Sequence, residues 1–145
     1  MMKVLVIDDE APIRLLCRVN LEGEGMAVVE AADGASGLAA ASAEKPDAIL
    51  LDVMMPGLDG WDVAAALLED DETAGIPIVF LTARADLRDR ARGMDLGGID
   101  YVTKPFNPVE LASTVRGVVD AVARGHREVL RAERLDQLRT LFGTD

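Results

Sequence analysis

The sequence predicts an α/β fold in which a parallel β-sheet carries helices on both faces. Two observations lead to this prediction. Short apolar runs alternate with longer segments in which apolar residues recur at helical spacing. The connections between these segments are short, and such an alternation is typical of consecutive β-α units. The chain has 145 residues, half of them hydrophobic, which suits one domain with a substantial core.

The first part of the chain predicts two β-α units. The apolar run KVLVI predicts a strand at 3–7. A helix is expected at 12–24, because Pro12 suits a first turn and apolar residues follow on one stripe. A weaker strand at 27–31 and a second helix at 34–44 come next.

The second part of the chain continues the alternation. Asn107 and Pro108 suit the N-cap and first turn of a last helix. Between the helix at 34–44 and Asn107, apolar runs predict three strands and segments of helical period predict two helices. In chain order these are strand 48–52, helix 61–70, strand 77–81, helix 86–98 and strand 99–102.

The tail is expected to continue the last helix past Arg124. We therefore divide the chain into a domain of residues 1–122 and a helical extension or linker at 123–145. The apolar stripe of the tail is interrupted at Gly125 and resumes in a shifted phase, so a fifth helix of ordinary length with a solvated or frayed end is the alternative. The stripe consists of Leu111, Val115, Val118, Val122, Leu135, Leu138 and Phe142.

Composition limits the function. The net charge is −11, and residues 118–145 are neutral, so all of the acidic excess lies in residues 1–117. This acidity argues against direct binding to nucleic acid or an anionic membrane and is compatible with divalent cations. The only cysteine, Cys17, excludes an internal disulfide and is interpreted as a core residue. The apolar stretch Val4–Ile7 is too short for a signal peptide or a membrane span, so a cytoplasmic protein is expected.

Polar residues follow four of the five predicted strands. Asp8 and Asp9 come after the first strand, Asp52 ends the third, Thr82 follows the fourth and Lys104 follows the fifth. In a sheet of order 2-1-3-4-5, these four strands are neighbours, and their carboxyl ends open into one crevice at the switch point. The second strand, at one edge, offers no comparable group.

This set of residues can perform phosphoryl transfer. Carboxylates as close as Asp8, Asp9 and Asp52 repel unless a cation or proton intervenes, and their oxygens suit Mg²⁺. Lys104 supplies a positive charge for a phosphate, and the Thr82 hydroxyl can donate to an anionic oxygen. An aspartate can attack phosphorus to give an acyl phosphate, and such transfer needs mainly positioning and charge neutralisation.

Three alternatives fit less well. The acids after the first strand can simply favour a helix N-terminus. A cofactor-binding protein of the same fold needs a Ser/Thr/Gly-rich phosphate loop there, whereas this chain has Asp-Asp-Glu at 8–10. A phosphohydrolase with an aspartate nucleophile typically has a second acid two residues later, and that position is Met54.

Four motifs, in order, carry a specific resemblance. They are VLVIDDE at 4–10, ILLDVMMPGLDG at 49–60, FLTA at 80–83 and DYVTKPF at 100–106. Over roughly residues 1–122 the chain resembles the receiver domain of bacterial two-component response regulators. The resemblance implies a flavodoxin-like, doubly wound sheet of five parallel strands in the order 2-1-3-4-5, with five helices.

The resemblance also assigns roles in the metal site. It implies that Asp52 is the phosphoacceptor and that Mg²⁺ is the cofactor. Asp9 is then a direct metal ligand, Asp8 a metal-site carboxylate acting mostly through water, and Met54 the donor of a backbone carbonyl. Such a domain is a switch with intrinsic self-phosphorylation and self-dephosphorylation chemistry rather than a metabolic enzyme.

The remaining implied roles concern signalling. Lys104 bonds the phosphoryl group, Thr82 is the switch hydroxyl, and Tyr101 is the aromatic side chain that changes rotamer with it. The implied partner is a sensor histidine kinase or a phosphotransfer protein, with a homodimer through the fifth helix or its extension and an output domain outside this chain as further expectations. The alternative is a degenerate receiver that acts as a phosphorylation-independent interaction module, although no key group is missing.

Overall fold

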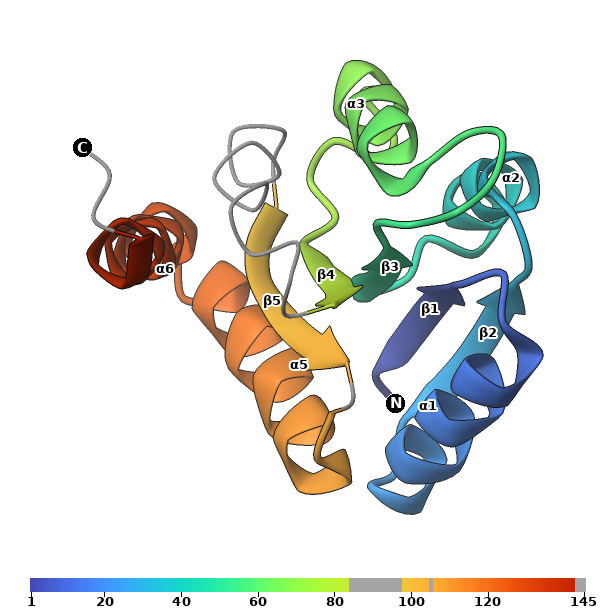
Figure 1. The fold of residues 1–145 in the computed structure, drawn as a ribbon, viewed down its shortest axis with the longest axis horizontal. Helices are drawn as coiled ribbons and strands as arrows, with labels where there is room; N and C mark the ends of the chain where they lie inside the picture. The colour runs from blue at the N-terminus through green and yellow to red at the C-terminus, as the bar shows by residue number, and fades with distance from the viewer. Residues whose placement is uncertain (84–97, 105, 143–145) are drawn as a thin grey trace.

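The computed structural model describes residues 1–83, 98–104 and 106–142 of the chain. Within them, five strands form one parallel sheet in the order β2-β1-β3-β4-β5 (Figure 1). The predicted fold class and strand order are therefore confirmed. The strands are β1 (Lys3–Ile7), β2 (Ala27–Ala31), β3 (Ala48–Asp52), β4 (Ile78–Ala83) and β5 (Gly98–Lys104).

The described helices are α1 (Ala11–Gly23), α2 (Gly34–Glu44), α3 (Gly60–Glu69), α5 (Pro108–Ala123) and α6 (Arg127–Phe142). The first three begin and end within one residue of the predicted bounds. The predicted helix at 86–98 lies outside the described residues, except for Gly98, which begins β5. None of the described helices is long and apolar enough to cross a membrane.

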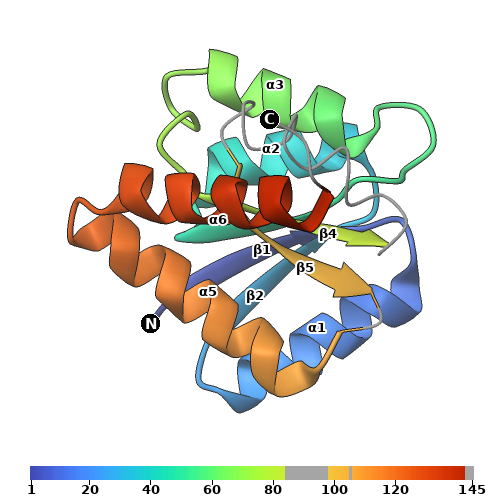
Figure 2. The same cartoon turned by 60° about the vertical axis from the view of Figure 1, so that its left-hand side comes forward.

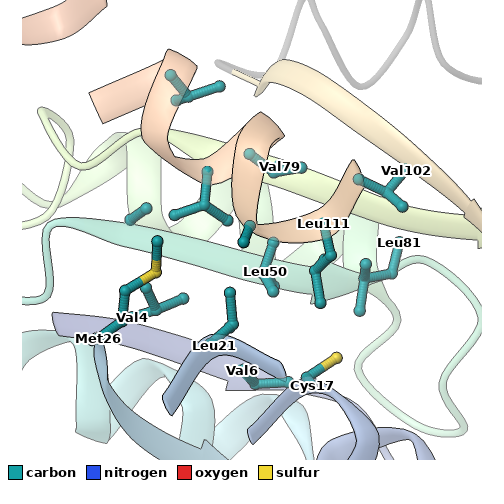
Figure 3. Packing of buried hydrophobic residues seen from close by; sticks show 14 residues of the cluster. Val4, Val6, Cys17, Leu21, Met26, Leu50, Val79, Leu81, Val102 and Leu111 are labelled. Carbon is teal, nitrogen blue, oxygen red and sulfur yellow. The ribbon is translucent and has the colours of Figure 1, made fainter. Parts of the chain in front are cut away.

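The helices cover both faces of the sheet, and each face has its own core. Successive residues of a strand point to opposite faces, so Val4 and Val6 of β1 join the core under α1 and α5, while Leu5 and Ile7 join the core under α2 and α3. Figure 3 shows the first of these cores, in which Cys17 is fully buried as expected. Because both faces are covered, the central strands are apolar except near their carboxyl ends, where Asp52 and Thr82 lie.

Side-chain caps fix where three of the helices begin. The Asp33 carboxylate accepts from the Ser36 amide at the start of α2, and Asp59 forms a capping box with Asp62 at the start of α3. Asn107 accepts from the Val109 amide, as its predicted N-cap role requires. These caps satisfy amides that have no partner inside the helix, so each loop enters its helix at a defined point.

The predicted continuous helix from Pro108 to Phe142 is wrong. The helix α5 ends at Ala123, and Gly125 adopts a left-handed conformation with φ of 74°. The His126 amide donates to the Ala121 carbonyl at 2.7 Å and the Gly125 amide donates to the Val122 carbonyl at 3.1 Å. These two bonds form a Schellman motif, which terminates a helix because glycine reaches positive φ without steric penalty.

After this break, α6 turns back onto the domain instead of projecting into solvent. It crosses α5 and lies beside the edge strand β5 (Figures 1 and 2). Leu130 packs against the core under α1 and α5. Arg134 Nε lies 3.0 Å from the Asp100 Oδ2 of β5, and Arg127 donates to the Gly75 carbonyl at 2.8 Å. One face of α6 is therefore engaged with its own chain.

Candidate functional site

The sheet brings the predicted acidic residues together at the carboxyl ends of β1 and β3. These strands are paired through Ile7 and Leu51, so Asp8 and Asp52 follow at the same edge. One carboxylate oxygen from each of Asp8, Asp9 and Asp52 lies within 4.8 Å of the others. Asp8 is 0% and Asp52 2% exposed, whereas Asp9 lies at the surface. Two of the three carboxylates are thus largely removed from solvent.

Each buried carboxylate is oriented by its own loop. Asp8 Oδ1 accepts from the Glu10 amide at 2.9 Å, and Asp52 Oδ1 accepts from the Met54 amide at 3.1 Å. In both cases an aspartate accepts from the amide two residues later, which is a local turn that aspartate readily forms. The Met54 side chain is exposed, so it is the backbone of Met54 that meets Asp52.

The loop after β3 returns directly over the backbone of Asp52, and Gly60 makes this approach possible. The Gly60 amide donates to the Val53 carbonyl at 3.1 Å. A Cβ atom at Gly60 would collide with the Asp52 carbonyl oxygen and would lie 2.6 Å from the Val53 Cα. Only glycine fits there without displacing the backbone of the acidic residue, so Gly60 allows the loop to pass close to Asp52.

The register of β4 and β5 places the other two polar residues at the same edge. Leu81 is the partner of Asp52, so the next residue, Thr82, lies one position beyond it and is 1% exposed. In turn Thr82 pairs with Thr103, and Ala83 pairs with Lys104. The backbone of Lys104 therefore lies at the correct end of the sheet, and its side chain is outside the part of the structure that is described.

Tyr101 lies further back along β5, opposite Phe80 of β4. It is half-buried against the core under α2 and α3. The rings of Phe80 and Trp61 are 5.0 Å apart in the same core. Trp61 also lines a hollow of about 340 Å³ next to the loop after β3, together with Val53 and Met54. The only tryptophan of the chain therefore lies beside the loop that follows Asp52 and packs against Phe80, the strand partner of Tyr101.

The acidic cluster fits a hard divalent cation. Its donors are carboxylate oxygens on three residues, which is the donor type that Mg²⁺ and Ca²⁺ prefer. The surface position of Asp9 leaves room for metal-bound water, which Mg²⁺ gives up reluctantly. Three carboxylates this close also repel one another, and a bound cation relieves that repulsion.

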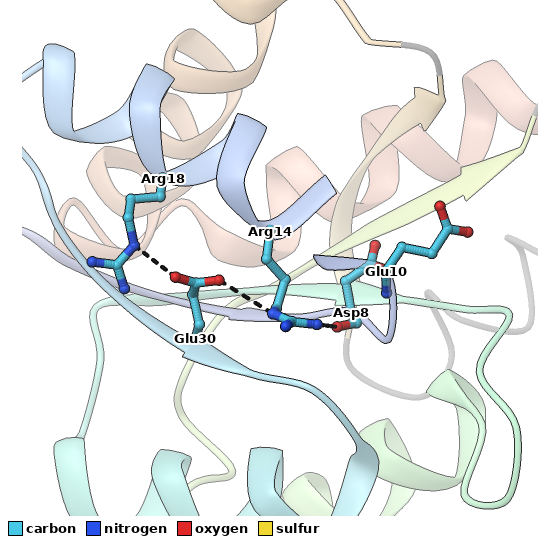
Figure 4. Close-up of polar contacts among 5 residues, drawn as sticks. All are labelled: Asp8, Glu10, Arg14, Arg18 and Glu30. Atoms are coloured by element: carbon cyan, nitrogen blue, oxygen red, sulfur yellow. Dashed lines mark hydrogen bonds and ion pairs between the residues drawn. The ribbon is translucent and has the colours of Figure 1, made fainter. Parts of the chain in front are cut away.

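Sequence reasoning missed a network of charged side chains behind the cluster. Arg14 and Arg18 of α1 both bind Glu30 of β2, and Arg14 also donates to the Asp8 carbonyl (Figure 4). The signal in the sequence was a pair of arginines four residues apart on one helix, with an acid inside the next strand. The acidic residue of this signal lies on the second strand, whose end carries no group comparable to those of the other four strands.

The fold and the cluster together define a class: a doubly wound α/β domain with an acidic cluster at its switch point. The model of the response regulator receiver domain family matches residues 4–116. The chain belongs to this family, as its four motifs predicted.

Several curated relatives of the chain are named as regulators of transcription. The DNA-binding dual master transcriptional regulator RpaA of Synechocystis is 39% identical over 94% of this chain and 57% of its own length. The alkaline phosphatase synthesis transcriptional regulatory protein PhoP of Bacillus subtilis is 44% identical over 81% of this chain and 48% of its own. The chain spans about half the length of such curated relatives.

A solved receiver matches nearly end to end. The chemotaxis protein CheY4 of Vibrio cholerae superposes with a TM-score of 0.77 at 34% identity, covering 81% of this chain and 98% of its own. Domains of this family are signalling switches rather than metabolic enzymes, bind Mg²⁺ at an acidic pocket, and interact with histidine kinases or phosphotransfer proteins.

Proposed function

We propose that this domain accepts a phosphoryl group on Asp52 in a Mg²⁺-dependent reaction and that phosphorylation switches its interaction surface. The donor is a sensor histidine kinase, a phosphotransfer protein or a small phosphodonor. One observation carries the proposal: a buried carboxylate ends the central strand β3 and faces two further carboxylates within 4.8 Å. Negative charge of this density away from solvent is stabilised by a bound cation, which would also offset the negative charge of an incoming phosphoryl group.

In the transfer, an oxygen of Asp52 attacks the phosphorus of the donor. A bond forms between that oxygen and phosphorus, and the bond to the leaving group breaks, with the electron pair leaving on the donor. Asp8, Asp9, Asp52 and the Met54 carbonyl would hold Mg²⁺. The ion supplies charge neutralisation for the phosphoryl oxygens. Self-dephosphorylation is a separate hydrolysis: water attacks the same phosphorus, the bond between phosphorus and the Asp52 oxygen breaks, and the carboxylate and inorganic phosphate are released.

The other residues of the proposed site stabilise and report the modified state. Lys104 and the Thr82 hydroxyl each offer a donor to the phosphoryl oxygens. Thr82 lies on β4 next to β5, and Tyr101 lies two residues before Thr103, the partner of Thr82. A shift of Thr82 towards the phosphoryl group would therefore change the space available beside Tyr101. In this way phosphorylation of Asp52 would alter the edge strand β5.

The proposed partners follow from this chemistry and from the length of the relatives. A kinase or phosphotransfer protein delivers the phosphoryl group, and an output domain outside this chain receives the signal. We also propose that the chain self-associates through α5 and the tail, which requires a conformational change first. The engaged face of α6, which includes Leu130 and Arg134, must first leave the chain's own β5 edge.

The test is intact-mass spectrometry after incubation with acetyl phosphate and Mg²⁺. We expect one added phosphoryl group in the wild-type protein and none in Asp52→Asn, which keeps the shape but lacks the nucleophile. The matched control is Asp33→Asn, since Asp33 also follows a strand at this edge and asparagine keeps its capping bond. Equal labelling of Asp52→Asn and wild type would refute the assignment, and a wild type that no donor labels would favour the degenerate receiver.

A further inference from the structure

The turn between β1 and α1, which carries two of the acidic residues, is tied to the rest of the domain by a single arginine. The Arg14 guanidinium donates through Nη1 to the Asp8 carbonyl at 2.8 Å and through Nε to Glu30 Oε1 at 3.2 Å (Figure 4). Its side chain is 17% exposed. One planar group thus binds the backbone of the site and the edge strand β2 at once.

Glu30 in turn is held from a second direction. Its Oε2 accepts from Arg18 Nε at 2.7 Å, one helical turn further along α1. Glu30 pairs with Val6 in the sheet, two residues before Asp8. Strand pairing and two arginines therefore hold Glu30 in place. Glu30 can in turn orient the planar guanidinium group of Arg14.

The bond to the Asp8 carbonyl reinforces the turn that leads from β1 into α1. Glu10 is the N-cap residue of α1 and makes no side-chain capping bond. The Asp8 carboxylate accepts from the Glu10 amide, and the Asp8 amide donates to Ala31 of β2. Arg14 adds a charge-assisted hydrogen bond to the peptide group that joins Asp8 to Asp9. The orientation of this peptide group sets the direction in which the Asp9 side chain leaves the backbone.

We propose that Arg14, oriented by Glu30, is a positioning residue of the metal site: it preforms the Asp8–Asp9 turn so that both carboxylates can bind Mg²⁺ together. This inference rests on the proposed function and deepens it. Partners that orient metal ligands without touching the metal typically change affinity about 10–100-fold when they are lost.

The direction in which Mg²⁺ affinity changes when Arg14 is replaced distinguishes a positioning role from a purely electrostatic one. Removing a positive charge beside a cation site should tighten Mg²⁺ binding if only the electrostatic field mattered. Loss of a positioning bond should weaken it. Arg14→Met keeps the aliphatic stem, and so most of the packing, while it removes both the charge and the donors. The two explanations therefore predict opposite changes for one variant.

The experiment is a Mg²⁺ titration of the full chain, followed through Trp61 fluorescence and backbone amide resonances. We expect Arg14→Met to bind Mg²⁺ about 10-fold more weakly than wild type. Arg18→Met is the matched control, because it removes the other arginine of Glu30 and leaves the Asp8 carbonyl bond in place, and it should bind close to wild type. Arg14→Lys keeps the charge but cannot donate to Glu30 and to the Asp8 carbonyl with one planar group, so it should not restore the Mg²⁺ affinity.

Two further readouts exclude a general loss of structure. Urea unfolding without metal identifies conditions in which each variant is folded, and the titrations are made there. At saturating Mg²⁺ the phosphorylation rate of Arg14→Met should return towards wild type, because affinity and not chemistry was lost. Equal or tighter Mg²⁺ binding by Arg14→Met would overturn the inference, and if that variant does not fold, wild-type affinity in Arg14→Lys would do so. A wild type that binds no Mg²⁺ would instead overturn the proposed function itself.

Discussion

Among the three clustered carboxylates, Asp9 differs from the others because it reaches solvent while Asp8 and Asp52 are buried. Its removal should have opposite effects on the two properties of the site. Asp9→Ala should weaken Mg²⁺ binding at least about 10-fold, since a proposed direct ligand is lost. It should also stabilise the metal-free protein, because one of three repelling charges disappears.

Trp61 fluorescence during Mg²⁺ titration measures the first effect, and urea unfolding in EDTA measures the second. Unchanged Mg²⁺ affinity in Asp9→Ala would contradict the proposed ligand set. Lower stability in EDTA would show that Asp9 serves the fold rather than the metal.

Gly60 provides a second test at the scale of one residue. A methyl group there meets the Asp52 carbonyl oxygen and the Val53 Cα. We expect Gly60→Ala to destabilise the domain by about 1–3 kcal/mol and to slow labelling of Asp52, because the acceptor backbone must move. The matched control is Gly117→Ala on α5, where an added Cβ has nothing within 4 Å. Alanine should stabilise that helix by about 0.5–1 kcal/mol and leave labelling unchanged.

Chemical denaturation and the initial rate of phosphorylation measure these two variants. Wild-type labelling in a destabilised Gly60→Ala protein would mean that the position of the Asp52 backbone does not limit the reaction.

At the scale of elements, the cap of α2 makes stability depend on pH. Hydrogen bonds from the Ser36 amide and hydroxyl lower the pKa of Asp33 below its ordinary value of 3.8. A group whose folded pKa is depressed adds stability that is present above pH 3.8 and lost as pH falls through the folded pKa.

Asp33→Asn keeps an acceptor at the cap but cannot titrate. Its melting temperature should therefore lie below that of wild type at pH 7, and the difference should shrink as the pH falls below 3.8. Thermal unfolding at several pH values measures this difference. A difference that stays constant through this range would mean that the Asp33 charge does not contribute to the cap.

The sequence predicted these elements well wherever a local pattern determined them. The strands and first helices follow from apolar periodicity, and Asn107 follows from its place before Pro108. The predicted continuation of α5 past Arg124 is wrong, because Gly125 is the C′ residue of a Schellman motif and ends the helix. Whether a glycine ends a helix depends on what the next helix can pack against, and that is a tertiary property.

The same distinction holds for the site. The common position of Asp8, Asp9, Asp52 and Thr82 could be predicted because strand ends in a parallel sheet share one edge. Arg14 and Glu30 could not, since their contact depends on the angle at which α1 packs beside β2, and no periodicity specifies that angle.

At the scale of the whole molecule, the tail is part of the folded body. The face of α6 that meets β5 carries Arg127 and Arg134, and the protein as a whole has a net charge of −11. Asp100 is 9% exposed at its side chain, so its pairing with Arg134 is the most buried of the described α6 contacts between charged side chains.

Arg134→Ala should therefore release α6. The Asp100 carboxylate would then remain in a poorly solvated position without its arginine, which should lower the free energy of unfolding by about 1–3 kcal/mol. Limited proteolysis should cut within 127–142 faster in Arg134→Ala than in wild type, while Arg124→Ala, whose ion pair with Asp120 is exposed, should leave the pattern unchanged. Equal proteolysis of all three proteins would contradict this role of the pair. Light scattering on the same samples tests whether the released tail associates.

The central claim is that Asp52, surrounded by cation-binding carboxylates, is the residue that takes the phosphoryl group. The most direct measurement uses the wild-type chain: phosphorylation with acetyl phosphate, with Mg²⁺ or with EDTA, followed by borohydride reduction. Reduction converts an aspartyl phosphate to homoserine, which tandem mass spectrometry locates in the peptide. We predict homoserine at position 52 in the Mg²⁺ sample and at no position in the EDTA sample. Homoserine at another aspartate, or equal conversion in EDTA, would contradict the claim.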